Sequence, residues 1–347
     1  MITPINTIKK QTESLKGVWT ALITPMKKEG DPTNLEVDFE KYEGLINEQI
    51  DAGVHGLLIL GTTGQAPTFS DEEHIEVFTK ALDYIDGRVP VMVGASSNAT
   101  NQAFNLSETL LRHSDKAKIK PILLHATGYY NKPTQAGIFQ HYEYLAEHLN
   151  TGIMIYNVPG RTKSDIEVET IIELSKLPNI IGVKYAKEDA IDSVEKIVKK
   201  TCYDDFRVMS GNCGEFYDFL KAGASGVISA TANVVPSEFL KIYNLYIEGK
   251  VEESEKIQID LTDMIESVFL KDISNPQVLN FIFDSGSRSP LKDISDFKRY
   301  KYTDRKFYDR CNSALVMCIN PALKELKESL LPMVQEIHKD LLYNKEQ

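Results

Sequence analysis

Short apolar runs alternate with longer segments of helical periodicity between residues 18 and 249. The runs are rich in Val, Ile and Leu and lie at 18–24, 56–60, 90–94, 119–125, 152–156, 180–184, 206–210 and 226–229. Continuous apolar strands favour a parallel sheet that is covered on both faces. Eight strand–helix units of this length predict an α/β fold, a closed (β/α)8 TIM barrel. A doubly wound open sheet is the alternative, because a strand count alone does not establish closure.

Helix-boundary signals support this alternation. Ser70-Asp-Glu-Glu73 has the pattern of a capping box before an apolar helical segment. Gly53 and Gly87 lie where the carboxyl-terminal caps of two helices are expected. Pro236 opens the last helical segment of the alternating region.

The pattern changes to helices alone after residue 249. We therefore divide the chain into an N-terminal extension, 1–16, a barrel, 17–249, and a C-terminal helical region, 250–347. In the last region we expect helices over 252–269 and roughly 304–342, and an irregular insertion near 271–302, which is polar and contains Pro276, Gly286 and Pro290.

Composition and charge narrow the possible partners. The chain has 347 residues, of which 42% are hydrophobic and 26% charged, as is typical of a soluble globular protein. Its net charge of −11 argues against nucleic acid or an anionic membrane, because both require clustered Lys and Arg. Without a signal peptide or a long apolar span, we expect a cytoplasmic protein with reduced thiols at its four cysteines, Cys202, Cys213, Cys311 and Cys318.

Lys184 ends the sixth apolar run and is the first candidate for a catalytic residue. An ammonium cannot attack a carbonyl, and an ordinary lysine is neutral in only roughly one molecule per thousand at neutral pH. A nucleophilic lysine therefore needs a dry setting, which Ile180, Ile181 and Val183 would supply. The alternative is a lysine that caps the strand and extends to solvent.

Other polar residues follow the expected strands, at the end of a barrel where active sites lie. Gly61-Thr-Thr-Gly-Gln65 is a turn suited to a carboxylate or phosphate oxygen, or simply a tight turn. Tyr156 offers a phenol for proton transfer, and Arg161 offers a planar fork for a carboxylate, although either could be a structural hydrogen bonder. Tyr129 and Tyr130 are adjacent, so only one is expected to join Tyr156.

Metal and phosphate sites have little support. The seven histidines form no HxH or HExxH pattern, and the pair His141 and His148 is typical of a helix face. Neither a Walker motif nor GxGxxG is present. These patterns favour a lysine enzyme that needs no metal and no cofactor.

The order and spacing of the motifs resemble the dihydrodipicolinate synthase family, within the N-acetylneuraminate lyase superfamily of class I pyruvate aldolases. The resemblance covers about residues 17–239 and rests on Gly61–Gly64, Tyr129–Pro133, Tyr156–Thr162, Gly182–Lys184, Ser210–Gly211 and Gly226–Asn233.

The resemblance implies that Lys184 forms an imine with pyruvate, whose enamine attacks an aldehyde. Tyr156 would carry protons, and Thr62 would link it to Tyr130, which would reach in from a second subunit of a homo-oligomer, with a dimer of dimers expected. Thr63 would bind the pyruvate carboxylate. Ile228 and Gly211 would line the pocket, and Arg161 would bind the carboxylate of the aldehyde.

Arg161 makes L-aspartate 4-semialdehyde the expected aldehyde, with 4-hydroxy-tetrahydrodipicolinate, a precursor of lysine and diaminopimelate, as the product. The alternatives are another pyruvate aldolase, of the N-acetylneuraminate or 2-keto-3-deoxygluconate type, or a binding protein that holds a keto acid without turnover. A scaffold role for the C-terminal helices could coexist with catalysis.

The chain departs from the family pattern at several positions. Gln65 replaces an acid that usually ends the turn, which suggests a changed subunit contact, and Gly128 replaces a common proline. Tyr185 and Lys187 follow the lysine, so the rear of the pocket is expected to differ. At the positions that match the family's lysine-inhibition site, Asp71, His74, Asn98, Gln102 and Tyr129, agreement is partial, and we expect weak or absent inhibition by lysine.

Overall fold

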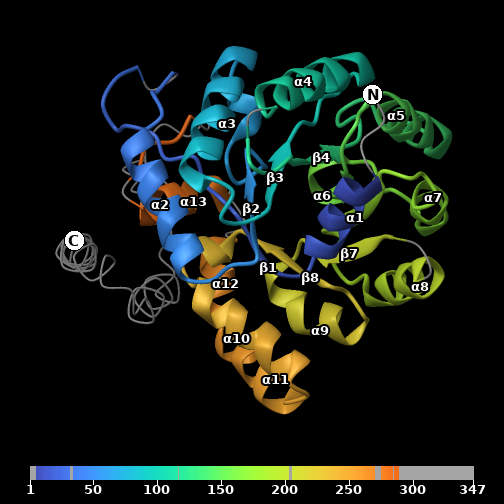
Figure 1. Cartoon of the computed structure of the whole chain (residues 1–347). Helices are drawn as coiled ribbons and strands as arrows, with labels where there is room; N and C mark the ends of the chain where they lie inside the picture. The colour runs from blue at the N-terminus through green and yellow to red at the C-terminus, as the bar shows by residue number, and fades with distance from the viewer. Residues whose placement is uncertain are drawn as a thin grey trace, which may run out of the picture.

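Eight parallel strands close into a barrel in the order β1 to β8, with β1 paired to β8 (Figure 1). The computed structural model describes residues 5–31, 34–115, 117–202, 205–269, 275–283 and 285–288. The strands are β1 Gly17–Ala21, β2 Gly56–Ile59, β3 Val91–Gly94, β4 Ile122–Ala126, β5 Ile153–Asn157, β6 Ile180–Tyr185, β7 Arg207–Ser210 and β8 Gly226–Ser229. The predicted (β/α)8 barrel is confirmed, and the open sheet is excluded.

Helices surround the barrel (Figure 1). They are α2 Phe39–Asp51, α3 Asp71–Ile85, α4 Thr100–His113, α5 Gln135–His148, α6 Pro159–Thr162, α7 Val168–Leu174, α8 Ile191–Thr201, α9 Phe216–Lys221 and α10 Pro236–Ile247, with short 3-10 turns η1 Ala66–Thr68, η2 Cys213–Glu215 and η3 Thr231–Asn233. The capping box at Ser70 and Glu73 is confirmed, and Gly53 and Gly87 have the positive φ angles expected after a helix.

Two apolar clusters hold these layers together. The larger one fills the space between the strands and the helices, and includes Tyr185 and Phe216. The smaller one fills the barrel interior, and includes Trp19, Tyr156 and Ile228. Alternate residues of each strand point to opposite faces, which assigns Tyr156 to the interior and Tyr185 to the helix layer.

The expected N-terminal extension contains a helix, α1 Ile5–Ser14, that closes the barrel at the amino ends of its strands. Leu15, just after it, belongs to the interior cluster. The buried Gln11 amide donates to the Pro121 carbonyl at 3.2 Å and accepts from the Gly152 amide at 2.8 Å, next to the starts of β4 and β5. The opposite end, where the strands finish, is left for the site.

The C-terminal region departs from the sequence expectation in two places. The single helix expected over 252–269 is two helices, α11 Val251–Asp260 and α12 Thr262–Val268. The insertion expected to be irregular contains a helix, α13 Asn275–Ile282. Pro276 fits the first turn of a helix, where its missing N–H group is not needed, and it therefore opens α13 instead of breaking it. The helix expected over 304–342 lies outside the described residues.

None of the helices in the described ranges is long and apolar enough to cross a membrane.

Candidate active site

Lys184 lies inside the barrel near the carboxyl end of β6. Its side chain is buried, with 5% of the residue exposed, and it pairs in register with Tyr156 of β5 and Met209 of β7. The Nζ atom lies 4.6 Å from the centre of the Tyr156 ring. Among the described residues no carboxylate forms an ion pair with it. The alternative in which Lys184 extends to solvent is therefore wrong.

The walls beside this amine are apolar. Ile228 of β8 is 1% exposed and shares the interior cluster with Tyr156 and Met209. Tyr156 is itself 8% exposed, so its phenol is largely withdrawn from bulk water. A pocket of this kind excludes water and strengthens the electrostatic interactions within it.

The Gly61–Gln65 turn follows β2 at the same end of the barrel. Thr63 is buried and Thr62 half-buried. The Gln65 amide donates to the Thr62 carbonyl at 3.1 Å, and the Thr24 hydroxyl donates to the Gly64 carbonyl at 3.0 Å. The second bond fastens the turn to the segment that follows β1.

Gln65 contacts the C-terminal region of its own chain. Its side chain is buried, and its Oε1 accepts a hydrogen bond of 2.7 Å from Ser287 of the same chain. The residue at this departure from the family pattern therefore takes part in a contact within the chain.

Arg288 anchors the segment that carries Ser287. Its guanidinium forms an ion pair with Glu73 at 2.5 Å, donates to the Thr68 carbonyl at 3.1 Å, and lies 4.9 Å from the centre of the Phe69 ring. The hydrogen bond from Arg288 holds the pKa of Glu73 below its usual value. Arg288, although distant in the sequence, thus holds in place the segment that follows the Gly61–Gln65 turn.

Gly211 lies directly after β7 and against the end of β6. Its amide donates to the Tyr185 carbonyl at 2.7 Å. A Cβ atom added at this position would lie 2.5 Å from the Cβ of Ala186. Only glycine fits without displacing the strand end that bears Lys184.

Tyr185 and Lys187, which follow Lys184, contact the helix layer and the segment between α6 and α7. Tyr185 packs into the helix layer, where burial raises its pKa. Lys187 forms an ion pair with Asp165, whose carboxylate also accepts from Asn157 at 2.9 Å and, by its hydrogen bond, raises the pKa of Lys187. Both residues support the loops after β5 and β6.

Arg161 lies in α6, just past the end of β5. It is exposed, and its Nη2 donates to the Asn275 side-chain oxygen of α13 at 3.1 Å. The sequence analysis missed Asn275, which is 6% exposed. The pair Asn275-Pro276 followed by the apolar Val278 and Leu279 is the signal of a helix start that could have revealed it.

Tyr130 is not brought into the barrel. It is 87% exposed on the loop between β4 and α5, and its φ angle is +75°, a strained value for a non-glycine residue. Tyr129 beside it is 37% exposed. A single chain therefore assembles Lys184, Tyr156 and the turn, and leaves Tyr130 outside.

Across the described residues, no group of three or more His, Cys, Asp or Glu is placed to hold a metal ion. Cys202 is exposed and Cys213 buried, and both are free thiols. Cys311 and Cys318 lie outside the described residues.

Comparison with known proteins gives a consistent result. The model of the dihydrodipicolinate synthetase family matches residues 14–296. The chain is 38% identical to the 4-hydroxy-tetrahydrodipicolinate synthase of Teredinibacter turnerae over 288 residues, which cover 81% of this chain and 94% of the relative.

Two solved structures extend the comparison. The dihydrodipicolinate synthase of Thermotoga maritima has a TM-score of 0.69 at 37% identity, with 75% of this chain and 85% of that chain covered. The Acinetobacter baumannii enzyme complexed with pyruvate has a TM-score of 0.76 at 28% identity, with 86% and 99% covered. The motifs, the barrel and these matches agree, and the chain belongs to the dihydrodipicolinate synthetase family.

Proposed function

We propose that the chain condenses pyruvate with L-aspartate 4-semialdehyde to form 4-hydroxy-tetrahydrodipicolinate, through an imine on Lys184. The observation that carries the proposal is the buried Lys184 amine, 4.6 Å from the Tyr156 ring at the carboxyl end of the barrel. The relatives described above carry the synthase name, and one of them was solved with pyruvate bound.

The reaction begins with attack of the neutral Lys184 amine on C2 of pyruvate. The tetrahedral intermediate loses water to give the imine, and loss of a proton from C3 gives an enamine. C3 then attacks the aldehyde carbon, and the aldehyde oxygen takes a proton. The amino group of the semialdehyde next attacks C2, which closes the ring and expels the Lys184 amine. Each step moves a proton near the lysine nitrogen, and the Tyr156 phenol beside it is the group to carry that proton. The imine itself acts as the electron sink, so this chemistry needs no cofactor.

The pyruvate carboxylate is assigned to the Gly61–Gln65 turn. Hydroxyl and amide donors of Thr62 and Thr63 suit a carboxylate, and the contacts of the turn with Thr24 hold them in place. Ile228 and Gly211 bound the space left for the three-carbon substrate.

The second carboxylate is assigned to Arg161. Its guanidinium is exposed at the strand ends, and the bond to Asn275 orients it there. A planar fork binds a carboxylate through two parallel hydrogen bonds, which favours aspartate semialdehyde over an uncharged sugar aldehyde. Turnover with aspartate semialdehyde should therefore exceed turnover with N-acetylmannosamine or glyceraldehyde, and the reverse order would favour the sugar-acid lyases.

Tyr130 is assigned to the site of a neighbouring subunit, in a homo-oligomer. Its 87% exposure in the single chain supports a position at an interface. Thr62 would link it to Tyr156 there. This assignment predicts complementation: Lys184→Ala and Tyr130→Phe protomers, each weakly active alone, should regain activity when mixed, because one site then receives an intact lysine and an intact partner tyrosine. Unchanged activity in the mixture would contradict it.

We also propose a cytoplasmic location. The exposed free thiol of Cys202 is suited to a reducing compartment, and both substrates are small metabolites.

A further inference from the structure

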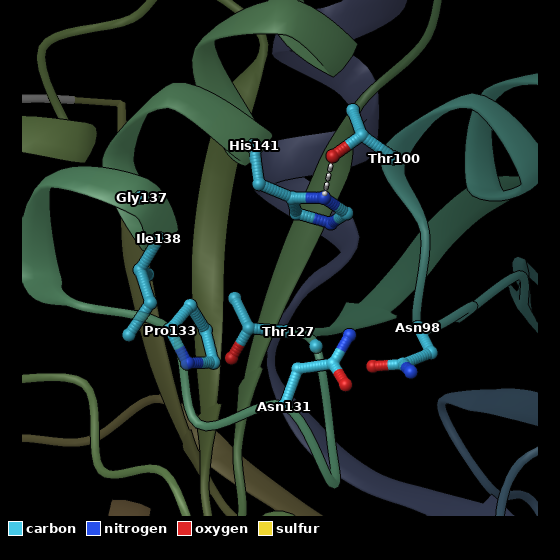
Figure 2. Close-up of a pocket in the computed structure, with 9 residues that line it drawn as sticks. Asn98, Thr100, Thr127, Asn131, Pro133, Gly137, Ile138 and His141 are labelled. Carbon is cyan, nitrogen blue, oxygen red and sulfur yellow. Dashed lines mark hydrogen bonds between the residues drawn. The ribbon is translucent and has the colours of Figure 1, made fainter.

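A cavity of about 120 Å³, partly open to solvent, lies beside Asn131 of the loop between β4 and α5 (Figure 2). This loop also carries Tyr130. Its walls come from the end of β4, the start of α4 and the first turns of α5, and include Asn98, Thr100, Asn131 and His141. None of the lining residues is an Asp, Glu, Lys or Arg. The cavity is separate from the barrel interior where Lys184 lies, and no part of the proposed reaction uses it.

Two buried polar atoms of this lining lack a hydrogen-bond partner within the part of the chain that is described. They are Nε2 of His141 and Oδ1 of Asn98. His141 is 7% exposed, and Figure 2 shows its second ring nitrogen turned away from Thr100 toward the space beside Asn131. A buried polar atom without a partner is unfavourable, so a ligand or water that bonds to it is stabilised there.

The contact with Thr100 determines which nitrogen of the His141 ring carries the proton. The Thr100 hydroxyl and His141 Nδ1 lie 2.9 Å apart. When the hydroxyl donates to Nδ1, the proton of the neutral ring lies on Nε2, which then faces the cavity as a donor. Burial lowers the pKa of His141 to about 4, which keeps the ring neutral at pH 7. A half-turn of the Asn98 amide exchanges its oxygen and nitrogen and gives a second donor.

The amino end of α4 adds an electrostatic potential that favours an anion. Thr100 is the first residue of this 14-residue helix, and the preceding Ala99 has no side chain that can cap it. The uncapped amino end of a helix carries about half a positive charge and free N–H groups, both of which favour an anion. With no cationic side chain in the lining, the site suits a single negative charge.

We propose that this cavity binds a small monovalent anion, such as a halide or formate, between His141, Asn98 and the start of α4. A volume of about 120 Å³ admits such an ion.

Binding of the anion is expected to stabilise the conformation of the loop that carries Tyr130. Gly128 and Asn131, on either side of the tyrosine pair, are part of the cavity wall. Tyr130 and Lys132 both have positive φ angles, +75° and +48°, so the loop is held in a strained shape. An anion that bridges the wall favours this shape. The effect on catalysis rests on the proposed role of Tyr130, whereas binding itself does not.

Binding is tested by NMR of the histidine rings in the full-length Lys184→Ala protein, which needs no turnover. Formate should move the His141 signals to a plateau, whereas gluconate, a much bulkier anion, should not at equal ionic strength. The exposed His113 serves as an internal control, and the His141 signals are assigned by their loss in His141→Asn.

A matched pair of variants sharpens the test. Thr100→Ser keeps the hydroxyl and should keep formate affinity, whereas Thr100→Val keeps the shape and should weaken binding about tenfold, as expected for one hydrogen bond. Bromide in crystals should give an anomalous peak between His141 and Asn98.

Equal shifts with formate and gluconate, or equal affinities of the two Thr100 variants, would overturn the proposal, as would the absence of bromide at this position. Formate binding by a protein that traps no pyruvate in its Lys184 form would count against the proposed function and leave the anion site intact.

Discussion

Replacing Gly211 by alanine should weaken pyruvate binding without unfolding the barrel. The added Cβ would lie 2.5 Å from the Cβ of Ala186 and 3.2 Å from the Tyr185 carbonyl oxygen. Both contacts are with the end of the strand that carries Lys184, and one of them is with rigid backbone. The strand end must therefore move by several tenths of an ångström.

The magnitude follows from the cost of overpacking. An extra methyl group in a packed site costs about 1–3 kcal/mol. If this cost appears entirely as weaker binding of pyruvate at Lys184, the pyruvate concentration for half-maximal imine formation rises about 5- to 160-fold.

The assay is borohydride trapping of the imine over a range of pyruvate concentrations, with denaturant unfolding alongside. Gly214→Ala is the matched control, because a Cβ three residues further along meets no atom within 4 Å. The control should behave like the wild-type chain in both measurements. A Gly211→Ala protein with the wild-type pyruvate dependence would refute the argument that this glycine protects the position of Lys184.

Three further predictions follow from other parts of the structure. Arg161→Ala should leave pyruvate trapping unchanged and raise the KM for aspartate semialdehyde by at least tenfold, since a charge-assisted hydrogen bond contributes about 1.5–3 kcal/mol; equal effects on both substrates would argue against its assignment. Burial lowers the pKa of His125 to about 3 and that of His141 to about 4. The unfolded chain binds these protons below about pH 6.5, so the free energy of unfolding should fall on acidification by up to about 1.4 kcal/mol per histidine per pH unit. Denaturant midpoints at several pH values, compared with those of His141→Asn, check this slope, and identical slopes would contradict it. Finally, lysine should inhibit weakly or not at all, because Gln102, which accepts from Ser97 at 2.9 Å, supplies no charge for its ammonium; a micromolar inhibition constant in steady-state kinetics would contradict this.

The barrel could be predicted because the sequence pattern that marks each of its strands is local. A strand buried on both faces must be continuously apolar, and this requirement is visible within each short run. The position of Lys184 at the end of such a run was enough to place it near the carboxyl end of the sixth strand. Strand alternation then puts its side chain on the same face as that of Tyr156.

The contacts that support the site could not be predicted in the same way. Ser287 bonds to Gln65 across 222 residues of sequence, and Arg161 bonds to Asn275 across 114. Hydrophobic periodicity reports which face of an element is buried and carries no information on which distant polar groups meet. The contact between Gln65 and Ser287 was missed for this reason.

The C-terminal region illustrates a different limit. Pro276 suggested irregular structure, because proline interrupts a helix interior. At the start of a helix the same residue is favourable, and the apolar residues after it pack α13 against the barrel. Tyr130 shows a third limit: it is 87% exposed in the single chain, so its proposed role at a second subunit remains a prediction from the family resemblance.

The most direct test of the central claim is peptide mapping after borohydride reduction in the presence of pyruvate. The account predicts one stable adduct, on Lys184, with none on the neighbouring Lys187 and none at all in Lys184→Ala. A folded protein that forms no adduct, or forms it on another lysine, would contradict the assignment of Lys184 as the nucleophile.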